Sequence, residues 1–143
     1  MNQNQLERYS FLWSEVRLII AAVALLIGGK PPIYLVPLTP IYGLVSALLT
    51  LCWIASGAAA VYLLFRWVTN GMKLFGGSDR KDTITFLILV VSGINLGLVG
   101  ITGRNFGMSI FSSYFVFVIV AVSYLASALY LYQRWSTSGQ KIF

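Results

Sequence analysis

Apolar segments on both sides of a polar stretch at residues 66–82 (RWVTNGMKLFGGSDRKD) constrain this chain more than any other feature. A helix needs about 20 mainly apolar residues to cross a bilayer, and it satisfies its own backbone hydrogen bonds there. We therefore predict an all-α fold, an integral membrane four-helix bundle in one transmembrane domain, residues 1–143. The expected spans are 9–28, 41–65, 83–101 and 107–132, and 66–82 forms a cytoplasmic loop.

The composition favours membrane insertion and excludes several kinds of site. Charged residues make up 10% of the chain, against about 25% in a soluble domain. The chain has no histidine and one cysteine, Cys52. These counts exclude an internal disulfide and histidine-bound haem, and they leave almost no ligands for a metal. Because no histidine base is present and the few carboxylates are isolated, we predict no catalytic residue, no metal, no cofactor and no enzymatic activity.

The first span contains two charged residues, Glu15 and Arg17. Its charge-free part, residues 18–29, is too short to cross a bilayer, so a full span has to include both charges. A signal peptide is the rival interpretation, because the segment has a basic start, a short apolar core and a small-residue pattern at 22–24. That pattern lies early within the apolar core, and we predict a retained span.

Prolines, hydroxyls and carboxylates mark the other boundaries. Pro31 and Pro32 cannot continue the first helix. Thr39-Pro40 is typical of a helix start, since a hydroxyl cap precedes a proline in the first turn. Asp82 is expected to cap the third span, where a carboxylate faces the positive end of the helix dipole.

The distribution of basic residues predicts the orientation. Only Lys30 and Arg104 lie on one side of the predicted bundle. Eight others lie on the side that we assign to the cytoplasm: Arg8, Arg17, Arg66, Lys73, Arg80, Lys81, Arg134 and Lys141. This bias places both termini inside, together with the polar tail at 136–143. It also explains the net charge of +6 without a nucleic acid as partner. We expect an integral protein of a prokaryotic cytoplasmic membrane.

Four polar residues are candidates for a site within the membrane: Glu15, Arg17, Ser92 and Asn95. At about 1.5 Å per residue, Arg17 and Asn95 lie at a similar depth near mid-membrane. A charge there costs about 2.5–3.5 kcal/mol, so Arg17 needs a partner or water. Two interpretations stay open. The residues contact an ion or solute, or the two charged side chains extend to the headgroups while Ser92 and Asn95 bond between helices.

Three glycines, Gly93, Gly97 and Gly100, lie on one face of the third span, and Asn95 lies on another. The spacing Gly93-x-x-x-Gly97 is typical of helices that pack closely in membranes. We predict a tight bundle with faces left for copies of itself.

The loop at 66–82 carries four basic residues, Arg66, Lys73, Arg80 and Lys81. We expect them to contact anionic lipid headgroups, at about 1 kcal/mol each, or a cytoplasmic protein. The stretch Gly76-Gly77-Ser78-Asp79 lacks the lysine and hydroxyl residue that end a phosphate-binding loop. It is expected to be a flexible turn.

The second span, the loop and the third span resemble the hairpin of conjugative, type IV secretion pilins. The similar residues are Gly71-Met72-Lys73, Gly76-Gly77-Ser78-Asp79 with Arg80-Lys81, and Gly93 and Gly97 in an apolar helix. The resemblance covers about a quarter of the chain, and two further spans surround it. It implies a bundle that associates with copies of itself.

These observations predict a small non-enzymatic membrane protein that acts as a packing or assembly subunit of a homo- or hetero-oligomeric complex. The expected partners are membrane lipids and either copies of the chain or other membrane proteins. One alternative is a small channel or transporter whose polar path uses Arg17, Asn95 and Glu15. A second alternative is a self-assembling protein of the pilin or holin kind.

Overall fold

The computed structural model describes residues 2–35, 41–110 and 113–143, and these residues form helices and no strand. Four of the helices are long and apolar enough to cross a membrane. The elements in chain order are α1 (Gln3–Leu26), the 3-10 turn η1 (Pro32–Leu35), α2 (Tyr42–Thr69), α3 (Arg80–Thr102), α4 (Phe106–Ile110) and α5 (Tyr114–Thr137). The prediction of an all-helical protein with four candidate membrane-spanning helices is confirmed.

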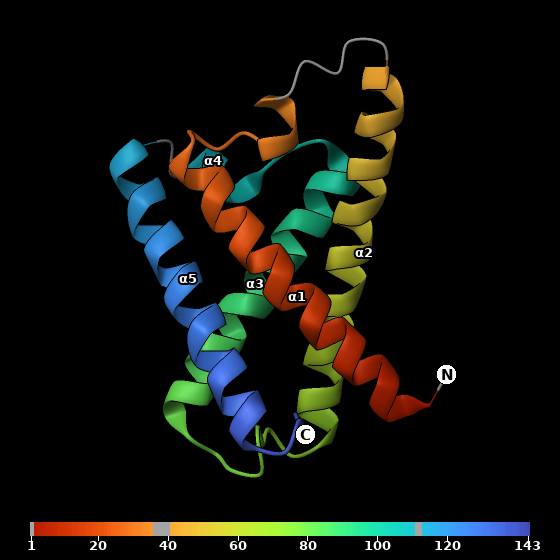
Figure 1. Ribbon diagram of the computed structural model, residues 1–143, viewed down its shortest axis with the longest axis vertical. Coiled ribbons are helices and arrows are strands. Elements are labelled where there is room, and N and C mark those ends of the chain that lie inside the picture. The colour runs from red at the N-terminus through yellow and green to blue at the C-terminus, as the bar shows by residue number, and fades with distance from the viewer. Residues whose placement is uncertain (1, 36–40, 111–112) are drawn as a thin grey trace.

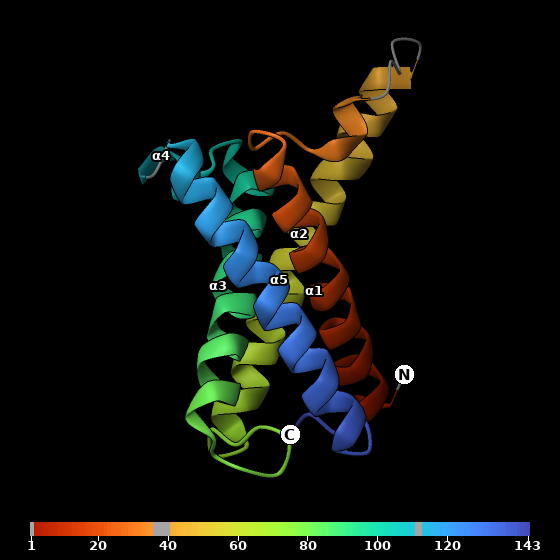
Figure 2. The same cartoon turned by 60° about the vertical axis from the view of Figure 1, so that its left-hand side comes forward.

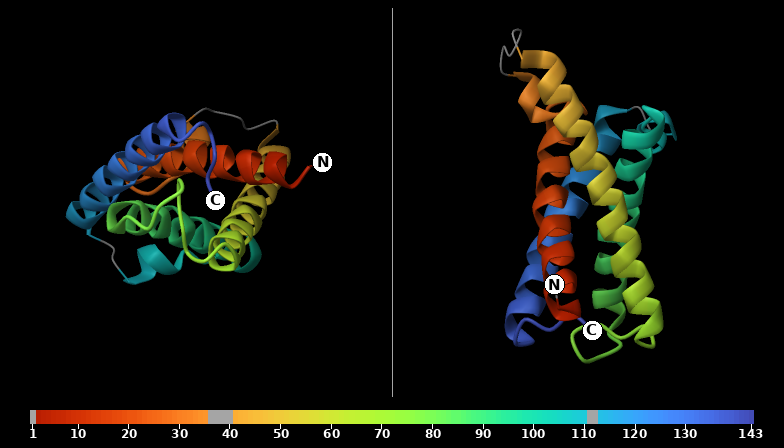
Figure 3. Two further views of the ribbon diagram at one scale, coloured as in Figure 1. Left: turned by 90° about the horizontal axis from the view of Figure 1, so that it is seen from below. Right: turned by 90° about the vertical axis from the view of Figure 1, so that its right-hand side faces the viewer.

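The four long helices form one bundle, in which α1 crosses the others at a slant (Figure 1). The most extensive contact is between α2 and α3, and α1 packs mainly against α5. The two pairs meet where α1 contacts α2 and α3, and where α3 contacts α5. Both termini lie at the end of the bundle that also holds the connection between α2 and α3 (Figures 1 and 3).

Two glycines bring the backbones of α2 and α3 into contact. A Cβ atom added to Gly97 would lie 2.6 Å from the Cα atom of Gly57, and one added to Gly57 would lie 2.7 Å from the Cα atom of Gly97. Carbon atoms that are not bonded to each other pack at about 3.5–4.0 Å, so neither position has room for a side chain. Gly93 and Gly100 also lie against α2. The glycine face predicted on the third span is therefore the face that α3 turns to α2.

The connection between α2 and α3 folds under the bundle. Leu74 and Gly77 exchange two backbone hydrogen bonds, of 2.8 and 2.9 Å. Phe75 and Gly76 between them have φ angles of 51° and 78°, the pattern of a tight two-residue hairpin turn. Leu74 is only 1% exposed. The turn predicted at 76–79 begins earlier, as a hairpin turn over residues 74–77, and the buried Leu74 attaches its start to the bundle.

The C-terminal tail, expected to be polar, brings two apolar side chains to the same place. Ile142 is 3% exposed, and its carbonyl oxygen accepts a 2.7 Å hydrogen bond from the N–H of Phe75. The ring of Phe143 meets Phe86 edge-on, with 6.1 Å between centroids. The tail and the α2–α3 connection therefore close one end of the apolar core.

Asp79, rather than Asp82, caps α3. The Asp79 carboxylate accepts a 2.9 Å hydrogen bond from the N–H of Lys81. The predicted cap at Asp82 is wrong because this residue lies in the first turn of the helix with its side chain fully buried. Its partners are described with the candidate site.

The last long helix begins later than predicted. It starts at Tyr114 rather than near residue 107, after Ser113 in an extended conformation, and the short α4 precedes it. The predicted helix start at Thr39-Pro40 lies outside the described residues.

Candidate functional site

Arg17 points into the bundle and is 4% exposed. Its Nη1 atom donates a 3.0 Å hydrogen bond to Ser92 Oγ, and its Nη2 atom donates a 2.8 Å hydrogen bond to the carbonyl oxygen of Leu89. A Cβ atom at Gly93 would lie 3.2 Å from Nη2, so the glycine also makes room for the guanidinium. Two of the predicted polar residues, Arg17 and Ser92, are thus joined, and they link α1 to α3.

The same turn of α1 holds polar atoms without a partner. Ser14 Oγ, Glu15 Oε1 and Arg17 Nε are buried, and none has a hydrogen-bond partner among the described residues. Glu15 is 4% exposed, and neither of the ion pairs found in the described parts of the chain includes it. Buried polar side chains usually have a partner, so this turn departs from ordinary packing.

Asn95 is separate from Arg17 and bonds instead to the segment around α4. Its Nδ2 atom donates a 3.1 Å hydrogen bond to Asn105 Oδ1, and its Oδ1 atom accepts a 3.2 Å hydrogen bond from the N–H of Gly107. Asn105 Oδ1 also accepts from the N–H of Met108, at 3.1 Å. Arg17 and Asn95, the two residues of the predicted polar path, therefore belong to separate hydrogen-bond groups that share no residue.

Asp82 is the centre of a buried ionic group that the sequence did not predict. Nε and Nη2 of Arg134 donate to the two oxygens of this carboxylate at 2.9 and 2.8 Å, and the Tyr130 hydroxyl donates at 2.8 Å. The ion pair of Asp82 with Arg134 links α3 to α5. Asp82 is buried because it shares one helix face with Phe86 and Leu89, four and seven residues later. The spacing of these three residues is the signal in the sequence from which the burial of Asp82 could be predicted.

A second unpredicted ion pair joins α1 to α2. Arg66 Nε donates a 2.6 Å hydrogen bond to Glu7 Oε1. Of the four residues predicted to contact lipid or a partner, Arg66 is therefore already bonded, whereas Lys73, Arg80 and Lys81 are exposed. Nothing in a single sequence connects two residues that are 59 positions apart.

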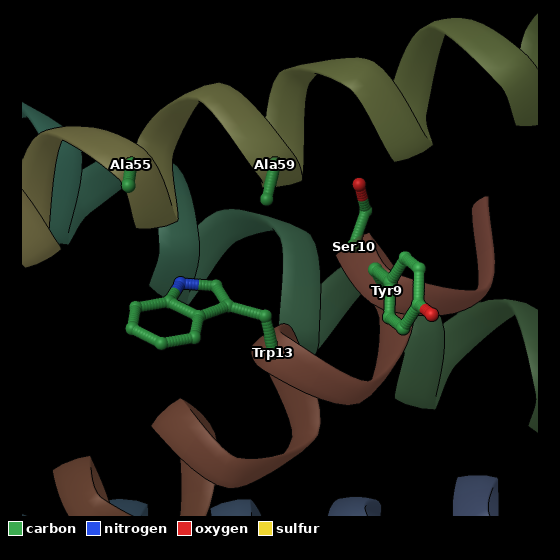
Figure 4. Close-up of a pocket in the computed structure, with 5 residues that line it drawn as sticks. All are labelled: Tyr9, Ser10, Trp13, Ala55 and Ala59. Atoms are coloured by element: carbon green, nitrogen blue, oxygen red, sulfur yellow. The ribbon is translucent and has the colours of Figure 1, made fainter. Parts of the chain in front are cut away.

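A shallow apolar groove of about 260 Å³ lies between α1 and α2, lined by Tyr9, Ser10, Trp13, Ala55 and Ala59 (Figure 4). The indole of Trp13 lies along this groove, and its Nε1 atom donates a 3.0 Å hydrogen bond to Ser56 Oγ. Ser56 in turn donates to the carbonyl oxygen of Cys52, at 2.7 Å. The bond from Trp13 to Ser56 holds α1 to α2, and the bond from Ser56 to Cys52 lies within α2.

Three buried charged side chains of the described residues tie one helix to another. Arg17 ties α1 to α3, Glu7 ties α1 to α2, and Asp82 ties α3 to α5. Within the same described ranges, no group of three or more histidine, cysteine or acidic residues is placed to hold a metal ion. Among the buried charged side chains of the described residues, Glu15 alone makes no hydrogen bond or ion pair to another helix.

We expect Arg17→Leu to have opposite effects on two steps of assembly. Insertion of α1 should become easier, because a central arginine costs about 2.5–3.5 kcal/mol. Docking of α1 on α3 should weaken by about 1–2 kcal/mol, because two interhelical hydrogen bonds are lost. Insertion can be measured with a glycosylation reporter in microsomes, and stability by unfolding in mixed micelles. The matched control is Arg8→Leu, near the start of α1; equal effects of the two variants would contradict the prediction.

Comparison of the chain with protein-family models, with curated proteins and with solved structures gives no match in any of the three.

Proposed function

We propose that this protein is a small non-enzymatic membrane subunit that associates with copies of itself through the N-terminal half of α2. Both termini would lie on the cytoplasmic side of a prokaryotic membrane. The observation that carries the proposal is a long stretch of α2, residues 42–55, in which no residue is buried. This end of the helix projects away from the rest of the bundle (Figures 1 and 2).

Small residues at exposed positions of this stretch support a helix as its partner. A Cβ atom added to Gly43 would meet no atom within 4 Å, and Ala47, one turn later, is also exposed. Small residues four apart let membrane helices approach closely. Gly93 and Gly97 of α3 use this device against α2 inside the bundle, and Gly43 with Ala47 would repeat it between copies. Large apolar residues around them, such as Leu44 and Leu48, are exposed.

The hydrogen bonds of the polar residues favour an assembly role over a channel. Arg17 is bonded to α3, and Asn95 is bonded to the segment around α4. In a water-filled path both side chains would face a continuous cavity. The groove between α1 and α2 lies at the surface and is lined mainly by apolar and aromatic groups.

The position of the basic residues supports the proposed orientation. Lys73, Arg80 and Lys81 are exposed and lie in or next to the connection between α2 and α3, which is at the end of the bundle that also holds both termini (Figure 1). Basic residues next to spans are enriched on the cytoplasmic side, where anionic lipids attract them. A cysteine-accessibility test of Ser138→Cys against Arg104→Cys, both made in a Cys52→Ser background, would measure the side of each end directly.

Oligomeric mass tests the proposal. The full chain in lipid nanodiscs, without detergent, should give a discrete particle of two or more copies. The double variant Gly43→Leu with Ala47→Leu should shift the mass towards one copy, because two large side chains would hold the helices apart. Ala126→Leu, at an exposed alanine of α5, is the matched control and should leave the mass unchanged. Self-association through this face would be ruled out if the unsubstituted chain is monomeric, or if Ala126→Leu lowers the particle mass as much as the double variant does.

A further inference from the structure

Glu15 has an environment that sets it apart from the other acidic residues. It lies about 18 Å along α1 from the first helical residue, at 1.5 Å per residue, and therefore near the middle of a helix long enough to span a bilayer. It is 4% exposed, and its Oε1 atom is buried without a hydrogen-bond partner among the described residues. In contrast, Glu7 and Asp82 each bind an arginine.

The basic groups that could neutralise Glu15 are occupied elsewhere. Arg17 follows two residues later on α1 and is near enough to attract a charged Glu15, but both its terminal nitrogens bond to α3, and no hydrogen bond or ion pair joins it to Glu15 in the described residues. On the helices that pack against α1, Arg66 of α2 binds Glu7, and Arg134 of α5 binds Asp82 of α3. Tyr124 of α5 is a further titratable group close to Arg17.

We propose that Glu15 is a proton-binding site in the middle of the bundle, with its carboxyl group neutral at neutral pH. An ionised carboxylate that is buried without a partner is so costly that such a group takes up a proton instead. The neutral acid removes this cost with one proton taken from water. A surrounding bilayer strengthens the argument, since it removes water from the outer faces of the same helices.

Proton binding at Glu15 would act on the packing of α1. Loss of the proton would leave a negative charge on the same turn as Arg17 Nε, a buried donor that has no acceptor among the described residues. The charge would draw the guanidinium away from Ser92 and Leu89, or draw water between the helices. Proton release would therefore loosen the tie between α1 and α3. This inference does not depend on the oligomeric state of the protein.

Infrared spectroscopy of the full chain in vesicles of ether-linked lipids, which have no ester carbonyl band, tests the proposal. At neutral pH the spectrum should contain the carbonyl stretching band of a protonated carboxylic acid. Glu15→Gln should remove this band, because glutamine keeps the shape of the side chain without the acid. Glu7→Gln, the matched control, should leave the band in place, since Glu7 is paired with Arg66. A spectrum without the band, or a band that persists in Glu15→Gln, would overturn the proposal.

A second measurement needs no substitution, and so remains decisive if Glu15→Gln does not fold. A hydrophobic carbodiimide adds to a protonated carboxylic acid: the acid oxygen bonds to the central carbon, the proton moves to nitrogen, and the adduct rearranges to a stable acylurea. Mass mapping of the unsubstituted protein should find this adduct on Glu15, in larger amount than on Glu7 or Asp82. The yield should fall as the pH is raised. Equal labelling of the three acids, or labelling of the others alone, would contradict proton binding at Glu15.

Discussion

Asp82→Ala should lower the free energy of unfolding by about 3 kcal/mol, the low end of the cost of removing one partner of a buried ion pair. The substitution deletes three hydrogen bonds from Arg134 and Tyr130 to a carboxylate that is fully buried. The low end applies because the Arg134 side chain is 37% exposed and can turn to water. Reversible unfolding in mixed micelles measures the change.

Asp79→Ala is the matched control for this variant. Asp79 lies three residues earlier, is exposed, and contributes a helix cap through its bond to the N–H of Lys81. Loss of such a cap costs about 1 kcal/mol. If Asp79→Ala proves as destabilising as Asp82→Ala, the carboxylate of Asp82 does not join α3 to α5 in the way that the structure shows.

The helical architecture could be predicted because one physical constraint decides it. Apolar runs of bilayer length have to form helices, and the chain contains four of them. The glycine face was also predictable, since Gly93 and Gly97 are four residues apart in one helix. Patterns of this kind lie within a single element, and the period of the helix converts them directly into a shared face.

The ties between helices could not be predicted in the same way. Glu7 with Arg66, and Asp82 with Arg134, join residues from different helices. Their pairing depends on the rotation and the relative height of each helix, which one sequence does not determine. Asp82 shows the difficulty, because its neighbours Arg80 and Lys81 are exposed while its own side chain turns to the apolar face.

Apolar contacts at the ends of the bundle were missed for a related reason. The charges of the stretch at 66–82 predict a polar loop, yet Leu74 within it is 1% exposed. Ile142 in the polar tail is 3% exposed and bonds to the same turn through its carbonyl oxygen. A few apolar residues in a polar segment have no periodicity from which burial could be predicted.

The same substitution, glycine to alanine, should have opposite effects at two positions of the bundle. Gly97→Ala should destabilise it by about 3 kcal/mol, the upper end of the cost of overpacking. The added methyl group would lie 2.6 Å from the Cα atom of Gly57, and backbone cannot move aside as a flexible side chain can. Gly43→Ala should leave stability unchanged or raise it by up to about 1 kcal/mol, because alanine favours a helix and the site is open.

Whether Gly97→Ala is less or more stable than the unsubstituted chain shows which effect dominates, close packing or helix propensity. If propensity dominated, both variants would be at least as stable as the unsubstituted chain. If the α2–α3 backbone contact holds the bundle together, Gly97→Ala unfolds at lower denaturant, and Gly57→Ala does the same from the opposite helix. The two losses should not add in the double variant, because either methyl group alone forces the helices apart. Unfolding in mixed micelles, at concentrations where the chain is monomeric, measures all four variants, and full additivity would mean that the two glycines do not share one contact.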